Sequence, residues 1–361
     1  MQDAVPNDRP AGRFGRVDRP GTKFFGSCTV SLSRLALAIA MALALNLCNS
    51  APSNAEPVTI NAARILNFRL GDNSVEFGKL HFMGGLALSS PDKDFGGLSG
   101  LRFLPGQDRI IAVSDAGHFF TAAIKRDILG APVDLSDATR DAIPGIGGFL
   151  SGLKQDSDCE AIEVSDTRAW LAFERKHRID AYDLQSGKLV GEPHPFNDKI
   201  RKLKLSSNGG IEALALLPAS SQGATRLLAI TEESLDAAGN MRAFIVTADA
   251  IQPLSLKRTD DFDATDAVFM PDGDLLVLER RFSVKTGPAM RLRRIAGSTI
   301  MEGALLDGEI LLEADNTYRI DNMEGLAIRR DADGNTVIAI ISDDNFSVLQ
   351  STLLLEFKIS D

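Results

Sequence analysis

Gly210-Ile211-Glu212-Ala213-Leu214, followed after a turn region by Leu227-Leu228-Ala229-Ile230-Thr231-Glu232, sets a pattern that the rest of the chain repeats. A small or acidic residue opens a short apolar run, and a second apolar run ends on an acidic residue. The same order recurs at 97–115 (GLSGL to IIAVSD), 158–175 (DCEAI to WLAFER), 265–281 (TDAV to LLVLERR) and 322–344 (NMEGL to IAIISDD). The five segments align on Ser99, Glu160, Glu212, Asp266 and Glu324.

The regular spacing of these positions is typical of a four-stranded propeller blade with long loops. Turn sequences at 105–106 (PG), 271–273 (PDG) and 333–334 (DG) lie between short apolar runs, as hairpins require. The C-terminal run 352–359 and the N-terminal segments 65–70 and 79–88 can complete one blade from both ends of the chain. We therefore predict an all-β propeller of five or six four-stranded blades, closed by N- and C-terminal strands. Helix should be limited to short turns near 135–143 and 197–203.

The segment 1–55 has the composition of a leader. A basic stretch precedes the apolar run 35–47, which is too short to span a bilayer comfortably. Ser53-Asn54-Ala55 then offers a small-x-small cleavage site before Glu56. We predict a secretory signal peptide with a long n-region over 1–55, a single propeller domain over 56–361, and a periplasmic or secreted bacterial protein. An uncleaved membrane-anchoring helix is the alternative.

Removing the leader makes the chain more acidic and leaves one cysteine. Residues 1–55 carry six basic and three acidic side chains, so the remainder has 33 basic and 46 acidic residues and a net charge of −13. This charge disfavours nucleic acids and anionic membranes as partners. Cys159 alone remains, so no internal disulfide can form. We expect a monomer without stable membrane association after cleavage.

The acids of the repeats are candidate metal ligands. In a propeller the first strand of each blade lines the central channel, so acids at equivalent places converge and repel one another unless a cation lies among them. Oxygen donors without His or Cys favour calcium, and less so magnesium, over zinc. The candidate ligands are Asp115, Glu160, Glu212, Asp266, Glu324 and Asp343. Caps and turns at strand ends are the alternative role for any one of them, and Arg175, Arg280 and Arg281 are alternative counter-ions.

Other catalytic motifs are missing from the sequence. It contains no G-x-S-x-G, no H-E-x-x-H and no Walker-type glycine loop. Of the four histidines, His118 alone lies near a repeat motif, just after Ser114 and Asp115. It is a candidate acid/base or ligand, with a structural role as the alternative.

Several motifs together resemble one family. They are FGGLSGL at 95–101, NGGIEAL at 208–214, NMEGL at 322–326 and, most specifically, SDDNFS at 342–347. The chain resembles the bacterial phytase-like, or "esterase-like activity of phytase", family over about residues 64–359. The resemblance implies a secreted or periplasmic β-propeller that is distantly similar to calcium-dependent propeller phytases.

Two classes of function follow. The first is a hydrolase of small phosphate or carboxylic esters with a divalent cation, calcium, at the channel. In it Glu212 or Glu324 is the base, His118 is a further catalytic candidate, and Arg175, Arg280 and Arg281 bind a phosphate group. A lactonase-like propeller enzyme, which holds a divalent ion among Glu, Asn and Asp side chains, is a variant. The second is a non-catalytic periplasmic propeller that binds a ligand or a protein.

Overall fold

The computed structural model describes residues 55–146, 154–219 and 223–359, which belong to one compact unit, Asn54–Asp361. The predicted leader lies outside the described residues apart from Ala55, so the signal peptide stays a prediction. Among the residues described, no helix has the length and apolar character needed to cross a membrane.

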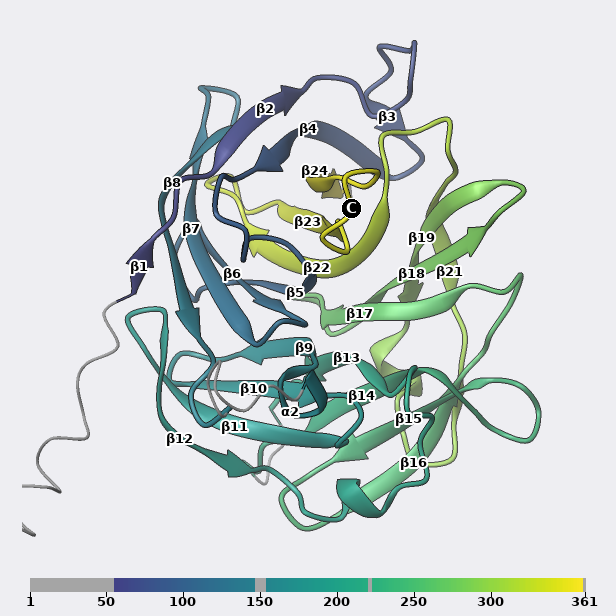
Figure 1. Cartoon of the computed structure of the whole chain (residues 1–361). Coiled ribbons are helices and arrows are strands. Elements are labelled where there is room, and N and C mark those ends of the chain that lie inside the picture. The colour runs from purple at the N-terminus through teal and green to yellow at the C-terminus, as the bar shows by residue number, and fades with distance from the viewer. Residues whose placement is uncertain (1–54, 147–153, 220–222, 360–361) are drawn as a thin grey trace, which may run out of the picture. The chain divides into compact units, whose positions relative to one another are not determined.

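Five antiparallel sheets form the blades of a propeller (Figure 1). Blade 1 contains β5 (Leu98–Phe103), β6 (Arg109–Ser114), β7 (His118–Arg126) and β8 (Pro132–Ala142), with β1 (Glu56–Pro57) at its edge. Blade 2 contains β9 (Cys159–Val164), β10 (Arg168–Phe173), β11 (Arg178–Gln185) and β12 (Lys188–Pro195). Blade 3 contains β13 (Ile211–Leu216), β14 (Leu227–Leu235), β15 (Met241–Val246) and β16 (Ile251–Leu256), with β20 (Leu305–Leu306) added in parallel.

Blade 4 contains β17 (Asp263–Phe269), β18 (Leu275–Ser283), β19 (Gly287–Ile295) and β21 (Glu309–Ala314). Blade 5 contains β22 (Asn322–Arg330), β23 (Thr336–Asp343), β24 (Thr352–Ile359), β4 (Leu80–Ser89) and β2 (Asn61–Ile65), with β3 (Glu76–Phe77) beside β4. Helix is confined to the short α2 (Lys154–Ser157), η1 (Ile200–Lys202) and η2 (Gly297–Thr299) among the described residues. The helical turn expected near 135–143 is wrong, because this segment is β8 and pairs with β7.

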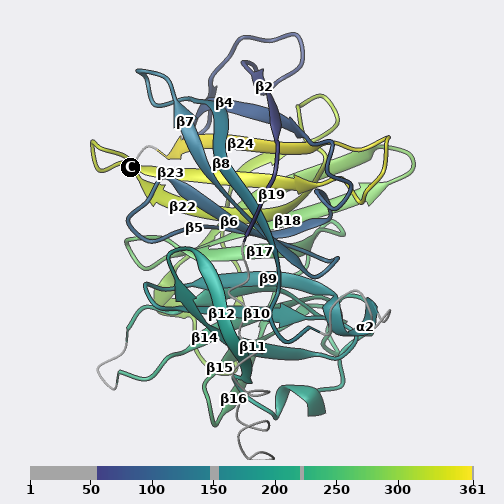
Figure 2. The ribbon, with the colours of Figure 1, turned by 60° about the vertical axis from the view of Figure 1, so that its left-hand side comes forward.

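The ring closes in blade 5, where both ends of the chain meet. N-terminal β4 pairs with C-terminal β24 from Leu80↔Ile359 to Leu88↔Thr352, and Figure 2 shows the two strands side by side. The innermost strands β5, β9, β13, β17 and β22 contact one another in this order, and β22 contacts β5. The predicted closure is confirmed, and the number of blades is five.

Five hydrophobic clusters hold the blades together, one between each pair of neighbouring sheets. For example, one cluster contains Leu278 of blade 4 and Leu326 of blade 5, and another contains Ile111 of blade 1 and Leu171 of blade 2. Because both faces of a blade are covered, the inner strands are mainly apolar and buried, and all eight residues of β23 are buried. This explains why the apolar runs in the sequence do not alternate with polar residues.

A single guanidinium joins all five innermost strands inside the channel. Arg102 of β5 is buried, and its nitrogens donate to both carboxylate oxygens of Asp266 and to the carbonyl of Ala267, on β17. They also donate to Glu163 of β9 at 3.2 Å and to the carbonyls of Leu214 on β13 and Leu326 on β22, at 2.5 and 2.7 Å. The Arg102 side chain therefore occupies the channel at this depth and ties the blades to one another.

Candidate functional site

Each innermost strand has a β-bulge near its start. The pairing skips one residue between Leu98 and Gly100, and equivalent skips occur in the other four blades. A bulge re-aims the side chain of the extra residue. The five bulged residues, which we call the inner ring, are Ser99, Glu160, Glu212, Thr265 and Glu324.

A second set of equivalent positions lies at the end of the second strand of each blade. The amides of Asp115 and Glu174 donate to the carbonyls of Gly97 and Asp158, beside the bulge of each blade. The corresponding residues of the five blades, which we call the outer ring, are Asp115, Glu174, Glu232, Arg280 and Asp343. Four of these five positions are acidic, so the two rings together carry seven carboxylates at one end of the channel.

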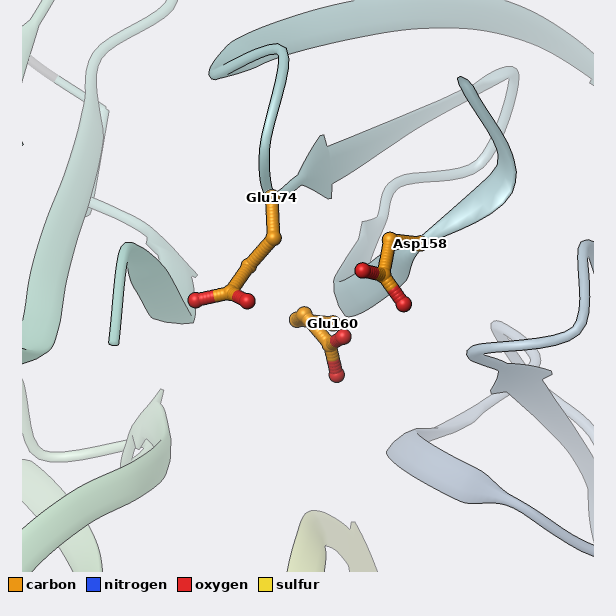
Figure 3. Close-up of side chains that lie close together, drawn as sticks. All are labelled: Asp158, Glu160 and Glu174. Atoms are coloured by element: carbon orange, nitrogen blue, oxygen red, sulfur yellow. The ribbon is translucent and has the colours of Figure 1, made fainter. Parts of the chain in front are cut away.

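The acids gather most closely in blade 2. Oxygens of Asp158, Glu160 and Glu174 lie within 4.8 Å of one another, and Figure 3 shows the Glu160 side chain between the other two. One oxygen of Glu174 already accepts hydrogen bonds of 2.5 Å from the amides of Gly209 and Gly210. The donors are hard carboxylate oxygens, the kind that calcium takes in proteins, so these residues fit a divalent cation.

Burial and mutual repulsion perturb the acids of both rings. Burial raises the pKa of Glu160 well above its usual value, and the nearby Asp158 carboxylate adds to this effect. Burial and the nearby Glu160 carboxylate raise the pKa of Glu212 in the same way. Burial raises the pKa of Glu324 to about 8 and that of Asp343 to about 6, although Arg280 acts in the opposite direction. Strongly perturbed acids from different blades at one place are typical of a functional site.

Arg280 is the basic member of the outer ring. Its guanidinium lies 2.9 Å from Glu232 and 2.8 Å from Glu324, so blade 4 supplies a counter-ion for acids of blades 3 and 5. The amide of Asn322 also donates to Glu324 at 2.8 Å. Glu324 is therefore held by one hydrogen bond and one ion pair, next to the only basic residue of the two rings.

The alignment of the fourth repeat was wrong by one residue. Thr265, not Asp266, is the bulged residue of blade 4. A shift of one residue reverses the direction of a strand side chain. The Asp266 carboxylate accordingly binds Arg102 at 2.8 and 3.1 Å instead of facing the acids of the rings. Burial raises the pKa of Asp266 to about 6, although the ion pair with Arg102 acts in the opposite direction.

The structure does not bring the three candidate phosphate-binding arginines together. Arg280 and Arg281 line a cavity of about 640 Å³ between blades 4 and 5. Arg175 is exposed, pairs with Asp158, and lines a different cavity of about 670 Å³ on blade 2. One phosphate group cannot contact all three side chains in this arrangement.

His118 lies apart from the rings. It begins β7 in blade 1, and burial lowers its pKa, while the charges acting on it come chiefly from Asp94 and Arg140. The remaining candidates, Asp115, Glu160, Glu212, Glu324 and Asp343, all belong to the two rings. The sequence did not identify Asp158, Glu174 and Glu232 as site residues. Glu174 and Glu232 are nevertheless the acids that end the second apolar run of their repeats, and this pattern could have identified them.

The fold and the site together define a closed five-bladed β-propeller with an acid-lined channel mouth that can hold a cation. The profile of the family described as Phytase-like, esterase-like activity of phytase, matches residues 93–346. The match covers more than half of the chain, and the chain belongs to this phytase-like family. Among curated proteins, none matches the sequence.

Solved structures similar to this chain share little sequence with it. The PQQ-bound aldose sugar dehydrogenase of Streptomyces coelicolor is 13% identical, with 85% of this chain and 100% of that chain covered and a TM-score of 0.45. An endo-arabinase from Bacteroides thetaiotaomicron VPI-5482 is 13% identical, with coverages of 75% and 96% and a TM-score of 0.44. An α-L-arabinofuranosidase from Podospora anserina, in complex with cellotriose, is 14% identical, with coverages of 74% and 93% and a TM-score of 0.46.

Proposed function

We propose that this protein is a periplasmic or secreted hydrolase of small carboxylic or phosphate esters that uses a divalent cation, calcium, at the mouth of the propeller channel. The observation that carries the proposal is the convergence of seven acids from four blades beside a cavity of about 640 Å³. Membership of the phytase-like family supports ester hydrolysis as the chemistry. We expect the protein to act as a monomer.

Asp158, Glu160 and Glu174 are the residues that would hold the cation. A bound calcium ion would polarise the ester and stabilise negative charge that develops on it. The Gly209 and Gly210 amides and Arg175 orient two of these three carboxylates before any ion arrives, through Glu174 and Asp158. Such orientation limits the reorganisation that binding requires.

Glu324 is the base in this proposal. Its carboxylate lies between Arg280 and Asn322, two residues that also line the cavity of blades 4 and 5. A water molecule between a bound ester and Glu324 can transfer its proton to this carboxylate. A base whose pKa lies near the working pH suits such a transfer. Glu212 stays as the alternative base.

The decisive experiment combines metal binding with turnover. The purified protein is treated with chelator, its melting temperature is measured with and without calcium, and 4-nitrophenyl esters and 4-nitrophenyl phosphate are offered as substrates. We expect a calcium-dependent rise in melting temperature and calcium-dependent release of 4-nitrophenol. A calcium shift without any turnover would instead favour the non-catalytic ligand-binding propeller.

A further inference from the structure

The cavity between blades 4 and 5 combines one available positive charge with exposed apolar side chains in its wall. Its lining comes from the β18–β19 hairpin, the start of β22 and the loop between β23 and β24. A volume of about 640 Å³ is that of a small-molecule pocket. Its two cations, Arg280 and Arg281, differ in how they are paired, and this difference determines which ligand charge the pocket can accept.

Arg280 is neutralised by the ring acids, whereas Arg281 is not. Arg280 contacts Glu232 and Glu324 at 2.9 and 2.8 Å. Arg281 donates to the backbone carbonyl of Asp260 at 2.8 Å, and its guanidinium lies 4.6 Å from the centre of the Phe262 ring. No carboxylate of the described residues forms a salt bridge with Arg281, so its positive charge remains available to a ligand.

Two carboxylates lie in or behind the wall of the same cavity. Asp321 lines the same cavity, and its oxygens accept from the backbone amides of Asn322 and Ser351 at 2.9 Å rather than from a basic side chain. Glu324 lies just behind Asn322, through a hydrogen bond of 2.8 Å. A ligand with one negative charge can pair with Arg281, while a ligand with many would be repelled by these carboxylates.

The rest of the lining is mixed: the apolar side chains lie beside the polar side chains of Asn345, Ser347 and Gln350. Phe282 and Leu349 are 68% and 90% exposed, and Pro288 and Ala289 complete the wall. Large apolar side chains left open to solvent at a pocket mark a surface that a ligand covers. The part of a ligand that covers Phe282 and Leu349 should be apolar, because neither side chain forms hydrogen bonds.

We propose that this cavity binds the substrate, and that the substrate is an ester with a single negative charge and an aryl or short alkyl group rather than a polyphosphorylated sugar alcohol. This inference rests on the proposed hydrolase function and specifies its substrate class. The anionic end pairs with Arg281, and the apolar group packs against Phe282 and Leu349. The ester itself then lies beside Arg280 and Glu324.

Binding can be tested separately from turnover. Calorimetry on the calcium-loaded full-length protein compares hexanoate, acetate, 1-hexanol and inositol hexakisphosphate. We expect hexanoate to bind more tightly than the other three. Arg281→Gln should weaken hexanoate roughly tenfold and leave 1-hexanol unchanged, because it removes a charge-assisted contact. Leu349→Ser should weaken hexanoate and 1-hexanol but leave acetate unchanged.

Two matched variants control for surface effects. Ile128→Ser removes another fully exposed apolar side chain, in the β7–β8 turn, and Arg330→Gln removes an exposed arginine of β22. Both should leave hexanoate binding unchanged. Tighter binding of inositol hexakisphosphate than of hexanoate, or unchanged hexanoate binding in Arg281→Gln, would overturn the substrate class. Selective hexanoate binding without hydrolysis of any ester, including bis(4-nitrophenyl) phosphate, would refute the hydrolase function but retain the anion pocket.

Discussion

The backbone amide of Gly97 donates a hydrogen bond of 3.2 Å to Oδ1 of Asp344, although 247 residues separate the two. The same oxygen accepts from the amide of Phe346 at 3.0 Å. The glycine-rich motif of blade 1 and the Asp-Asp-Asn-Phe motif of blade 5 therefore form one unit beside the outer ring. This unit requires a residue without a side chain at position 97, because Asp115 and Phe346 lie close to the Gly97 backbone.

Gly97→Ala should destabilise the protein by about 1–3 kcal/mol more than Gly106→Ala. Both glycines have positive φ, +61° and +66°, so both substitutions strain the backbone. A Cβ at Gly97 would overlap Asp115 and the Phe346 ring, whereas a Cβ at Gly106 has no atom within 4 Å. Urea unfolding of the two variants measures the difference. Equal losses of unfolding free energy would mean that the close approach of Asp115 and Phe346 does not add to the cost of Gly97→Ala.

Arg102→Met should cost about 3–5 kcal/mol, because it leaves two buried carboxylates without a counter-ion. These are Asp266, which is fully buried, and Glu163, which is 6% exposed. Adding Asp266→Asn to Arg102→Met should recover part of the loss, since one unpaired charge disappears. Arg330→Met, at an exposed arginine, is the control and should stay within about 0.5 kcal/mol of the wild type. Urea titration measures the free energies of unfolding. If Arg102→Met lowers this free energy no more than the control does, Arg102 does not stabilise the contact between the five innermost strands.

Stability in chelator should fall as the pH rises from about 4.5 to about 8. The pKa of Glu324 is raised from 4.5 to about 8 and that of Asp343 from 3.8 to about 6, so the folded protein binds more protons than the unfolded chain in this range. Unfolding then becomes easier with increasing pH. Calcium should flatten this dependence, because a cation favours the ionised carboxylates. Melting temperatures at a series of pH values test the sign, and a rise with pH in chelator would refute it.

Glu160→Gln should abolish the rise in melting temperature that calcium produces. The substitution keeps the size of the side chain and removes the carboxylate that lies between Asp158 and Glu174. At a calcium concentration 100 times the dissociation constant, the stabilisation lost would be about 2.7 kcal/mol. Glu313→Gln, at an exposed position on β21, is the matched control and should retain the full shift. If Glu160→Gln also retains it, the cation is held elsewhere.

Glu324→Gln should lower kcat by about 10²- to 10⁴-fold, as expected for the loss of a general base. The calcium-induced shift in melting temperature should persist, since the acids of blade 2 remain. Steady-state kinetics with a 4-nitrophenyl ester measure the first effect and thermal unfolding the second. Loss of the calcium shift in this variant would assign Glu324 to the cation instead of to proton transfer, and an unchanged kcat would exclude it as the base.

Much of the fold could be predicted because propeller repeats are local. Each inner hairpin is formed by two strands that follow one another along the chain, such as β5 and β6, so its apolar runs, its turn and its terminal acid are visible in one short segment. The strands of blade 5 show the opposite case. Pairing of β4 with β24 joins the two ends of the chain, and nothing in the spacing separates five blades from six. The β8 segment was mistaken for a helical turn because its strand identity depends on pairing with β7.

The sequence predicts that acids gather at the channel, but it does not place all of them correctly. The repeated sequence pattern identifies Glu160, Glu212 and Glu324, because a β-bulge recurs at the same point of each blade. It misplaced the fourth repeat, since Thr265 and Asp266 are adjacent polar residues and the pairing alone shows which is bulged. The partner of Asp266 could not be found from sequence either, because Arg102 lies 164 residues away.

The blade grammar, the family and the excess of acid at strand ends could all be established from the sequence, because these features repeat within segments of one hairpin. Which side chains face one another depends instead on the folded ring: Gly97 with Asp344, Arg102 with Asp266, and Arg280 with Glu232 and Glu324. The folded ring also separates Arg175 from Arg280 and Arg281 into two cavities. Closing the ring sets these distances, because the facing side chains belong to different blades and meet only when each blade packs against its neighbours.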